Sequence, residues 1–164
     1  MMSNSITTTM STANFNELFE FVAGAVKDYI TSFNADPKDF DMYIVKSWAN
    51  IVQNRGNPIH NHSDAHLSFV YYVNVPETIK TPIVFYNHYY RPEPFPGFSR
   101  YNSKTFDLVN AGTWQFEPTE GNVMVFPSTL SHETETVNST PDRGVQSRED
   151  LKNFRFSIAG DVVL

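Results

Sequence analysis

The sequence contains no cysteine, no basic run and no long hydrophobic segment. Without thiols the chain is not a disulfide-stabilised secreted scaffold, and any bound metal must be held by imidazole and carboxylate groups. The net charge of -6 argues against binding driven by the phosphates of nucleic acid. No window approaches the length of a membrane span, and no cationic segment precedes an apolar one at the start. We therefore expect a soluble cytoplasmic protein whose partner is a small molecule or a peptide, not nucleic acid or a membrane.

The length of 164 residues suits a single domain with its own hydrophobic core. We expect residues 1–12 to be disordered and residues 13–164 to form one domain. Nothing in the sequence indicates the oligomeric state.

A helix is predicted over residues 14–33, where apolar residues recur at helical spacing from Phe15 to Phe33. Asn14 and Glu17 have the spacing of a capping pair. Gly24 costs about 1 kcal/mol relative to alanine in a helix, unless its small size allows close packing. The apolar stripe predicts that the helix lies against a sheet.

The remainder, residues 41–164, reads as a β body, because short β-branched and aromatic segments are separated by turn residues. Aromatic residues make up 15% of the chain. Six segments are expected to be strands: 41–52, 66–75, 81–90, 112–118, 122–128 and 153–163. An all-β fold with an N-terminal helix is predicted, and a double-stranded β-helix, or jelly roll, satisfies the strand count.

Three of the five histidines lie just before the second predicted strand or at its first residue. His60 and His62 are two residues apart, so an extended backbone points both imidazoles to the same face, where one metal ion can reach both. His132, just after the 122–128 strand, is the candidate third ligand. His66 and His88 are more simply interpreted as structural histidines, whereas Asp64 is an alternative ligand because it forms a second His-x-carboxylate pair with His62.

Polar residues also alternate along the last predicted strand. Arg155 and Ser157 share one face of "NFRFSIAGD" with Ala159, opposite an apolar face that belongs to a core. An isolated guanidinium with a hydroxyl two residues away is suited to bidentate hydrogen bonding with the carboxylate of a ligand. Tyr72, on the polar face of the 66–75 strand, can add a phenol to the same pocket.

The order of these motifs carries a resemblance over roughly residues 42–164. "SWANI" is followed by H-x-H and "LSFVYYV", then by P-x-x-G-x-x-x-x-F-P-x-x-x-x-H and finally by "RFSIAGD". This order resembles the Fe(II)- and 2-oxoglutarate-dependent oxygenases, and it is similar to their small members in bacteria and tailed phages, which are related in pattern to prolyl hydroxylases. The resemblance implies the cofactors Fe(II), 2-oxoglutarate and O2.

The resemblance also implies residue roles. His132 corresponds to the distal iron ligand, Arg155 and Ser157 to the residues that bind 2-oxoglutarate, and Tyr72 to a tyrosine that assists them. Most of these oxygenases have a carboxylate in the first ligand pair. Here the distance to "VYYV" favours His60 and His62, while His62 with Asp64 remains the alternative. Hydroxylation of a peptidyl or small-molecule substrate is expected, with no catalytic group beyond the metal site.

Two other classes remain open. A cupin-like metalloprotein without 2-oxoglutarate would use His60, His62, His66 and His132, and it would require His66 but not Arg155. A non-enzymatic jelly-roll binding or virion module would need no histidine.

Two long segments are candidates for substrate access. Residues 86–104, which include Arg91, Arg100 and Lys104, form either a recognition surface or a loop that packs its own aromatic residues. Residues 138–153 form an exposed loop or lid.

Overall fold

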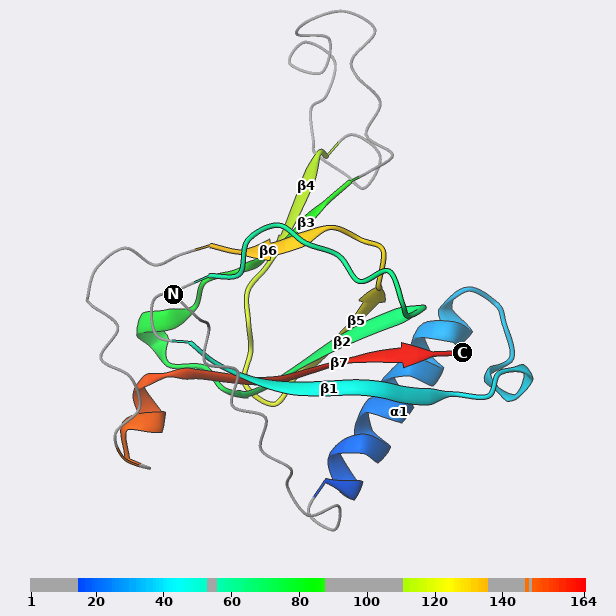
Figure 1. Ribbon diagram of the computed structural model, residues 1–164, viewed down its shortest axis with the longest axis horizontal. Helices are drawn as coiled ribbons and strands as arrows, with labels where there is room; N and C mark the ends of the chain where they lie inside the picture. Colours follow the sequence, from blue (N-terminus) through cyan, green and yellow to red (C-terminus); the bar gives the residue numbers. More distant parts are fainter. Residues whose placement is uncertain (1–14, 53–55, 88–110, 136–146, 148) are drawn as a thin grey trace, which may run out of the picture.

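The computed structural model describes residues 15–52, 56–87, 111–135, 147 and 149–164. The expected disordered segment 1–12, His88 and the cationic residues of the 86–104 segment lie outside these residues. Two sheets and one helix make up the described fold (Figure 1). No helix in the described ranges is long and apolar enough to cross a membrane.

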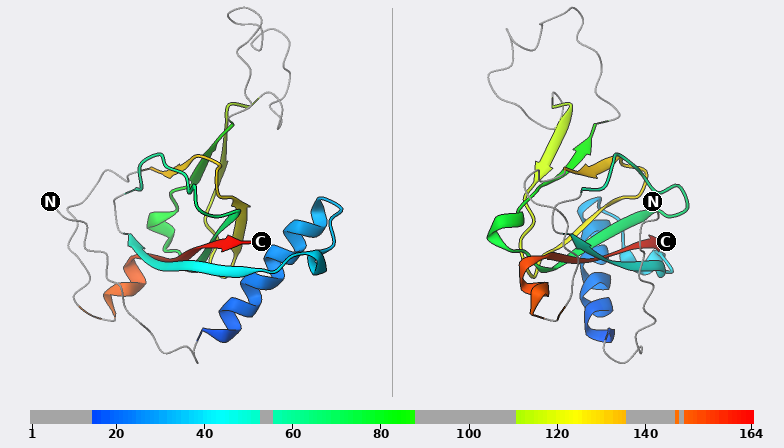
Figure 2. Two further views of the ribbon diagram at one scale, coloured as in Figure 1. Left: turned by 45° about the vertical axis from the view of Figure 1, so that its right-hand side comes forward. Right: turned by 60° about the vertical axis from the view of Figure 1, so that its left-hand side comes forward.

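Helix α1 (Asn16–Ser32) covers one face of the larger sheet (Figure 2). Its buried residues Val22, Val26 and Ile30 follow the predicted stripe, but Phe33 beyond its end is 67% exposed. The first capping position is Phe15, which makes no side-chain capping bond, and Asn14 lies outside the described residues. The helix ends at Ser32, and two residues later Asn34 has a positive φ of 59°, the left-handed conformation that closes many helices.

The larger sheet is antiparallel, in the order β1-β7-β2-β5. The order places the first and last strands of the chain side by side, with the second strand completing the centre. All four strands match predicted segments. Their bounds are β1 (Tyr43–Val52), β2 (Leu67–Asn74), β5 (Val123–Pro127) and β7 (Arg155–Val163).

The smaller sheet has the order β4-β3-β6 and lies across the other face of the larger sheet (Figures 1 and 2). Its strands are β3 (Ile83–Tyr86), β4 (Thr113–Phe116) and β6 (His132–Thr134). The sequence did not predict β6, and His132 begins this strand instead of following the previous one in a loop. In the parts of the chain that the structure describes, three short 3-10 segments lie in the connections: η2 (Pro37–Asp39), η3 (Glu77–Ile79) and η4 (Asp150–Asn153).

The core has two parts, one on each face of the larger sheet. Between α1 and the sheet, Val22, Val26 and Phe69 are among the buried residues. Between the two sheets, Tyr72, Phe85 and Phe126 are buried together. The alternation predicted along β2 and β7 is therefore confirmed, and it divides each strand between the two cores.

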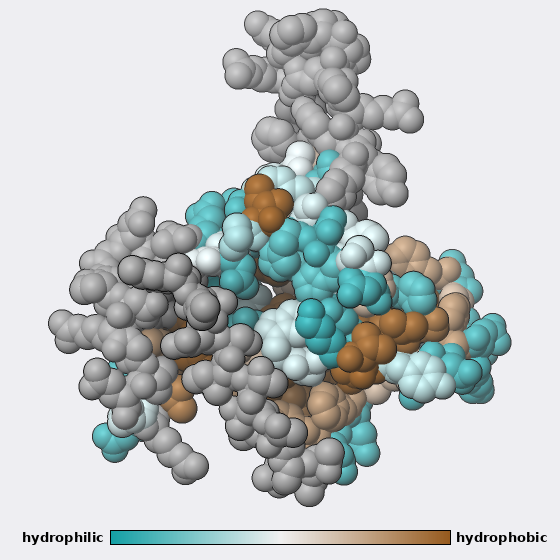
Figure 3. All heavy atoms as spheres, in the orientation of Figure 1, coloured by the Kyte–Doolittle hydropathy of each residue, from teal (hydrophilic) through white to brown (hydrophobic). Residues whose placement is uncertain are grey.

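β1 is an edge strand of the larger sheet, and part of its apolar surface is exposed. Val45 and Ile51 are 56% and 44% exposed. The space-filling view shows hydrophobic residues near β1 among hydrophilic ones (Figure 3). The polar pocket described below lies on the inner side of the sheet, away from α1.

Candidate metal centre and adjoining pocket

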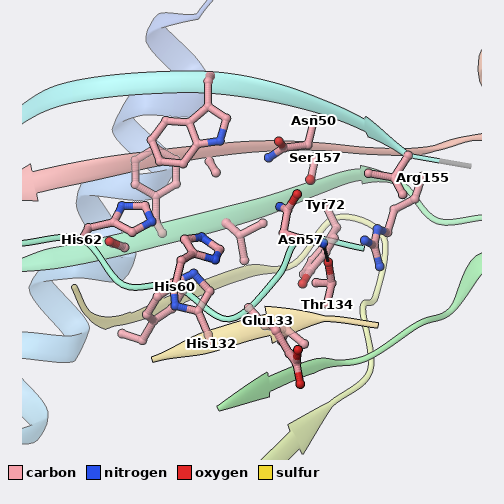
Figure 4. Close-up of a pocket in the computed structure, with 18 residues that line it drawn as sticks. Asn50, Asn57, His60, His62, Tyr72, His132, Glu133, Thr134, Arg155 and Ser157 are labelled. Atoms are coloured by element: carbon pink, nitrogen blue, oxygen red, sulfur yellow. Dashed lines mark hydrogen bonds between the residues drawn. The ribbon is translucent and has the colours of Figure 1, made fainter. Parts of the chain in front are cut away.

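Three histidines meet at one end of the gap between the sheets (Figure 4). One ligand atom from each of His60, His62 and His132 lies within 4.8 Å of the others. His60 and His132 face each other across a short antiparallel bridge, in which each backbone N–H donates to the other's carbonyl oxygen at 3.0 and 2.9 Å. The backbone N–H of His62 donates to the carbonyl oxygen of Ser128 at 2.8 Å. Main-chain hydrogen bonds thus hold all three ligand positions.

The Nδ1 atom of each imidazole contacts an oxygen acceptor. His60 Nδ1 lies 2.7 Å from the carbonyl oxygen of Pro58, and His132 Nδ1 lies 2.9 Å from that of Leu130. His62 Nδ1 lies 2.6 Å from Oδ1 of Asp161. Because a carbonyl oxygen only accepts, the proton of a neutral ring sits on Nδ1, which leaves the Nε2 lone pair available.

Burial favours the neutral form of His132, which is 6% exposed. The pKa of this histidine is lowered to about 4, mainly by desolvation and also by the neighbouring His60 and His62, against opposing effects of the Leu130 carbonyl and of Asp161. His132 is therefore unprotonated at neutral pH, as a metal ligand must be. Three imidazole ligands suit a divalent transition metal such as Fe(II), and three protein ligands leave coordination positions open.

The alternative ligands lie elsewhere. Asp64 is exposed, and its carboxylate accepts a hydrogen bond of 3.0 Å from the hydroxyl of Ser63. His66 is also exposed, and its Nδ1 accepts a 2.8 Å hydrogen bond from the backbone N–H of Leu164. Neither residue joins the histidine cluster found in the described part of the chain.

A row of polar side chains crosses the sheet beside the histidines. Asn50 of β1 and Tyr72 of β2 both pair in register with Ser157 of β7. All three line the same pocket as the histidines, and Tyr72 and Ser157 are 4% and 5% exposed. Burial raises the pKa of the Tyr72 phenol, against an opposing effect of Arg155, so this hydroxyl keeps its proton at neutral pH and can donate it in a hydrogen bond.

Arg155 closes the end of the pocket opposite the histidines (Figure 4). Its side chain is 4% exposed, and Nη1 donates a 2.9 Å hydrogen bond to the carbonyl oxygen of Thr81. Burial lowers the pKa of the guanidinium, but arginine stays charged in proteins. Within the residues that the structure describes, no carboxylate forms an ion pair with it. A buried cation without an anionic partner is costly, so this end of the pocket is suited to a ligand carboxylate.

Sequence reasoning missed several residues of this site, and three of them matter most for the histidines and the polar row. Trp48 and Asn50 line the pocket from β1, and Asp161 contacts His62 from β7. The signal for Asp161 was available, because the alternation of Arg155, Ser157 and Ala159 reaches Asp161 at the next step. Trp48 and Asn50 needed the pairing of β1 with β7, which joins residues more than 100 positions apart.

Comparison with known proteins agrees with this arrangement. Residues 46–147 match the sequence profile of the family described as "Putative 2OG-Fe(II) oxygenase". The match contains all three histidines and ends before Arg155. No protein of curated function matches the chain.

Three solved bacterial structures are similar in fold. An oxidoreductase of the 2OG-Fe(II) oxygenase family from Burkholderia pseudomallei is 15% identical, with a TM-score of 0.51 over 90% of this chain and 57% of its own. AviO1 from Streptomyces viridochromogenes is 8% identical, with a TM-score of 0.55 over 95% and 63%. HygX from Streptomyces hygroscopicus, solved with nickel and 2-oxoglutarate bound, is 10% identical, with a TM-score of 0.50 over 92% and 68%.

The chain thus spans about three-fifths of the length of the first two of these proteins. The fold is similar to that of a 2OG-Fe(II) oxygenase family structure, and the three histidines form a cluster that could hold a metal ion. By its sequence match, the chain belongs to the 2OG-Fe(II) oxygenase family. These comparisons give no support to the expected association with phages.

Proposed function

We propose that this protein is an Fe(II)- and 2-oxoglutarate-dependent dioxygenase that hydroxylates a small molecule or a peptidyl residue. The observation that carries the proposal is the pairing of two features in one pocket. Three imidazoles converge at one end, and the buried guanidinium of Arg155 lies at the other without a described carboxylate partner. A dicarboxylate that also binds the metal is a ligand suited to both ends.

In this proposal His60, His62 and His132 hold the iron through their Nε2 atoms. Their Nδ1 contacts to Pro58, Asp161 and Leu130 fix the ring orientations before metal binds. When bound, iron and 2-oxoglutarate supply an oxidation in which O2 hydroxylates a C–H bond while 2-oxoglutarate is converted to succinate and CO2. The protein contributes ligands, orientation and exclusion of water.

Arg155 pairs with the distal carboxylate of 2-oxoglutarate, and the hydroxyls of Ser157 and Tyr72 donate hydrogen bonds to the same cosubstrate. Charge-assisted bonds from a planar guanidinium fix the direction as well as the affinity of a carboxylate. Both hydroxyls are free for this task, because neither makes a hydrogen bond to any residue in the described ranges. The low exposure of all three residues strengthens these interactions.

We further propose that the two sheets are the halves of a double-stranded β-helix, with the site between them. The sheets enclose the pocket from opposite sides, since β1, β2 and β7 contribute Asn50, Tyr72 and Arg155 while β6 contributes His132. Trp48 packs beside His62, with 5.5 Å between the ring centroids. This aromatic wall helps to exclude water from the metal side of the pocket.

The cupin-like alternative has less support. It requires His66, whose Nδ1 is engaged by the backbone of Leu164 at 2.8 Å and which lies outside the histidine cluster. The cupin-like alternative also does not explain why the Arg155 guanidinium is buried in the pocket. A non-enzymatic module would explain neither the convergence of the imidazoles nor the buried guanidinium.

An anaerobic spectroscopic titration tests the proposal. Fe(II) added with 2-oxoglutarate is expected to give a weak visible charge-transfer band in the native protein. His132→Ala is expected to abolish the band by removing a ligand, and Arg155→Ala by releasing the cosubstrate. His66→Ala serves as the matched histidine control and is expected to keep the band. Absence of the band in native protein that has bound iron would contradict the proposal.

A further inference from the structure

Asp161 is a buried carboxylate directly behind the histidine cluster. It lies on β7, opposite Ser68 of β2, and is 5% exposed. Its Oδ1 atom lies 2.6 Å from Nδ1 of His62 and accepts a 2.8 Å hydrogen bond from the hydroxyl of Ser68. Burying a carboxylate costs free energy unless it is paired, so we expect Asp161 to have a specific role at this position.

The surroundings of Asp161 are built to hold it in place. The Ser68 hydroxyl lies 2.9 Å from that of Ser128, and these serines are 2% and 0% exposed. No lysine or arginine in the described ranges forms an ion pair with Asp161, whose charge partner there is His62. The field of the carboxylate is therefore directed at the imidazole and is not neutralised by a neighbouring cation.

The three histidines differ in what supports them. His60 and His132 donate from Nδ1 to neutral backbone carbonyls, whereas His62 contacts a carboxylate. Iron sites of the two-histidine, one-carboxylate type include a negative charge among their ligands. The cluster in this chain has three neutral ligands, and its carboxylate lies one imidazole farther from the metal position.

We propose that Asp161 is a positioning residue for the metal site and that its charge replaces, through His62, the carboxylate that the three-histidine ligand set lacks. This inference rests on the iron site of the proposed function. Asp161 fixes the proton of His62 on Nδ1 and turns Nε2 toward the metal. The negative charge of Asp161 also makes Nε2 a stronger electron-pair donor to the metal. Ser68 and Ser128 keep the carboxylate aligned.

Fe(II) affinity without 2-oxoglutarate separates orientation from charge. The measurement is anaerobic competition with a chromophoric chelator. Asp161→Asn keeps an oxygen that accepts a hydrogen bond from His62 but removes the negative charge, and we expect Fe(II) affinity to fall by about tenfold. Asp161→Ala removes both the acceptor and the charge. Its Fe(II) affinity is expected to fall by about 100-fold, the upper end of the usual effect of losing a hydrogen-bond partner of a metal ligand. Asp64→Asn neutralises an exposed carboxylate two residues from His62 and is the matched control, with affinity unchanged.

The spectrum with 2-oxoglutarate provides a second readout that a merely structural role would not move. Without the charge of Asp161 the iron is a poorer electron donor, so the charge-transfer band of Asp161→Asn is expected at shorter wavelength than in the native protein. Should Asp161→Ala fail to fold by circular dichroism, Ser68→Ala replaces it. That variant removes a hydrogen bond to Asp161 but leaves His62 intact, and a loss of several-fold in Fe(II) affinity is expected.

The outcomes are distinguishable. Native affinity and an unshifted band in folded Asp161→Asn would overturn the role of Asp161 and leave the iron site standing. An equal loss in Asp64→Asn would also overturn it, because the effect would then not be specific to Asp161. Failure of the native protein to bind Fe(II) would instead remove the proposed function itself, and this inference with it.

Discussion

The guanidinium of Arg155 is tied to the backbone of Thr81, where Nη1 donates to the carbonyl oxygen at 2.9 Å. Thr81 lies in the connection between β2 and β3, and Arg155 begins β7, so the bond ties the larger sheet to the connection that leads into the smaller sheet. One N–H of the five is used in this contact. The others remain to bind a carboxylate, with the position of the side chain already fixed.

Arg155→Ala is expected to raise the dissociation constant of 2-oxoglutarate by about 100-fold, because hydrogen bonds between charged groups contribute about 1.5–3 kcal/mol each. Titration of the charge-transfer band under anaerobic conditions measures this constant. The 2-oxo acid 2-oxobutyrate lacks the distal carboxylate and is expected to bind the native and variant proteins equally. A similar loss for both acids would mean that Arg155 does not bind that carboxylate.

The ligand set can be resolved by single substitutions that are scored by metal binding alone. Alanine at His60, His62 or His132 is expected to reduce Fe(II) affinity by at least about 100-fold, since each removes one of three ligands. Asp64→Asn and His66→Ala are expected to retain native affinity, because both side chains lie outside the cluster. A weakened Asp64→Asn protein with native affinity in His60→Ala would favour the alternative pair of His62 and Asp64.

The metal-free protein is expected to lose stability as the pH falls from 6.5 to 4. His132 has a folded-state pKa of about 4 against 6.5 for an unperturbed histidine, so in this window the unfolded chain binds a proton that the folded chain excludes. The free energy of unfolding falls by at most about 3 kcal/mol over this pH range, and it is restored when the pH is raised above 6.5. Urea unfolding with a chelator present measures it, and His132→Asn, which cannot titrate there, is expected to show a smaller loss. Equal losses in both proteins would assign the effect to other groups.

Gly24→Ala is expected to raise the free energy of unfolding by up to about 1 kcal/mol, because alanine is the better helix former. A Cβ atom at this exposed position meets nothing within 4 Å, so no packing reason for glycine remains. Gly160→Ala is the contrasting control, since its Cβ would lie 2.6 Å from the carbonyl oxygen of Lys46 and from the Phe69 ring. Chemical denaturation is expected to show destabilisation of that variant by about 1–3 kcal/mol.

Local periodicity was sufficient to predict the helix and the larger strands. The stripe through Val22, Val26 and Ile30 and the alternation along β7 each reflect one buried face, which a sequence displays directly. The three-residue strand β6 could not be predicted this way, because it is too short for any period to appear. Its existence depends on pairing with β3 and with the backbone of His60.

The candidate site was predictable where its residues follow strand alternation, as Arg155 and Ser157 do. The choice between His60 and Asp64 was predictable only as a preference, because both pairings with His62 have the same spacing and the distance to "VYYV" merely favoured His60. The fold separates the two residues: the bridge to β6 brings His60 to His132, while Asp64 is exposed beside Ser63. Contacts between distant strands, such as that of Asp161 with His62, carry information that no local pattern holds.

The bridge between His60 and His132 has a consequence for how the site responds to different metals. Its two reciprocal backbone hydrogen bonds set the spacing of these ligands by strand register, independently of any ion. The entropy cost of bringing these two ligands together is therefore part of folding. It does not recur each time the site loses and rebinds a metal ion. Ions of similar radius will therefore compete for the site by their intrinsic preference for imidazole, so iron occupancy in a cell depends on the supply of each metal as well as on the protein.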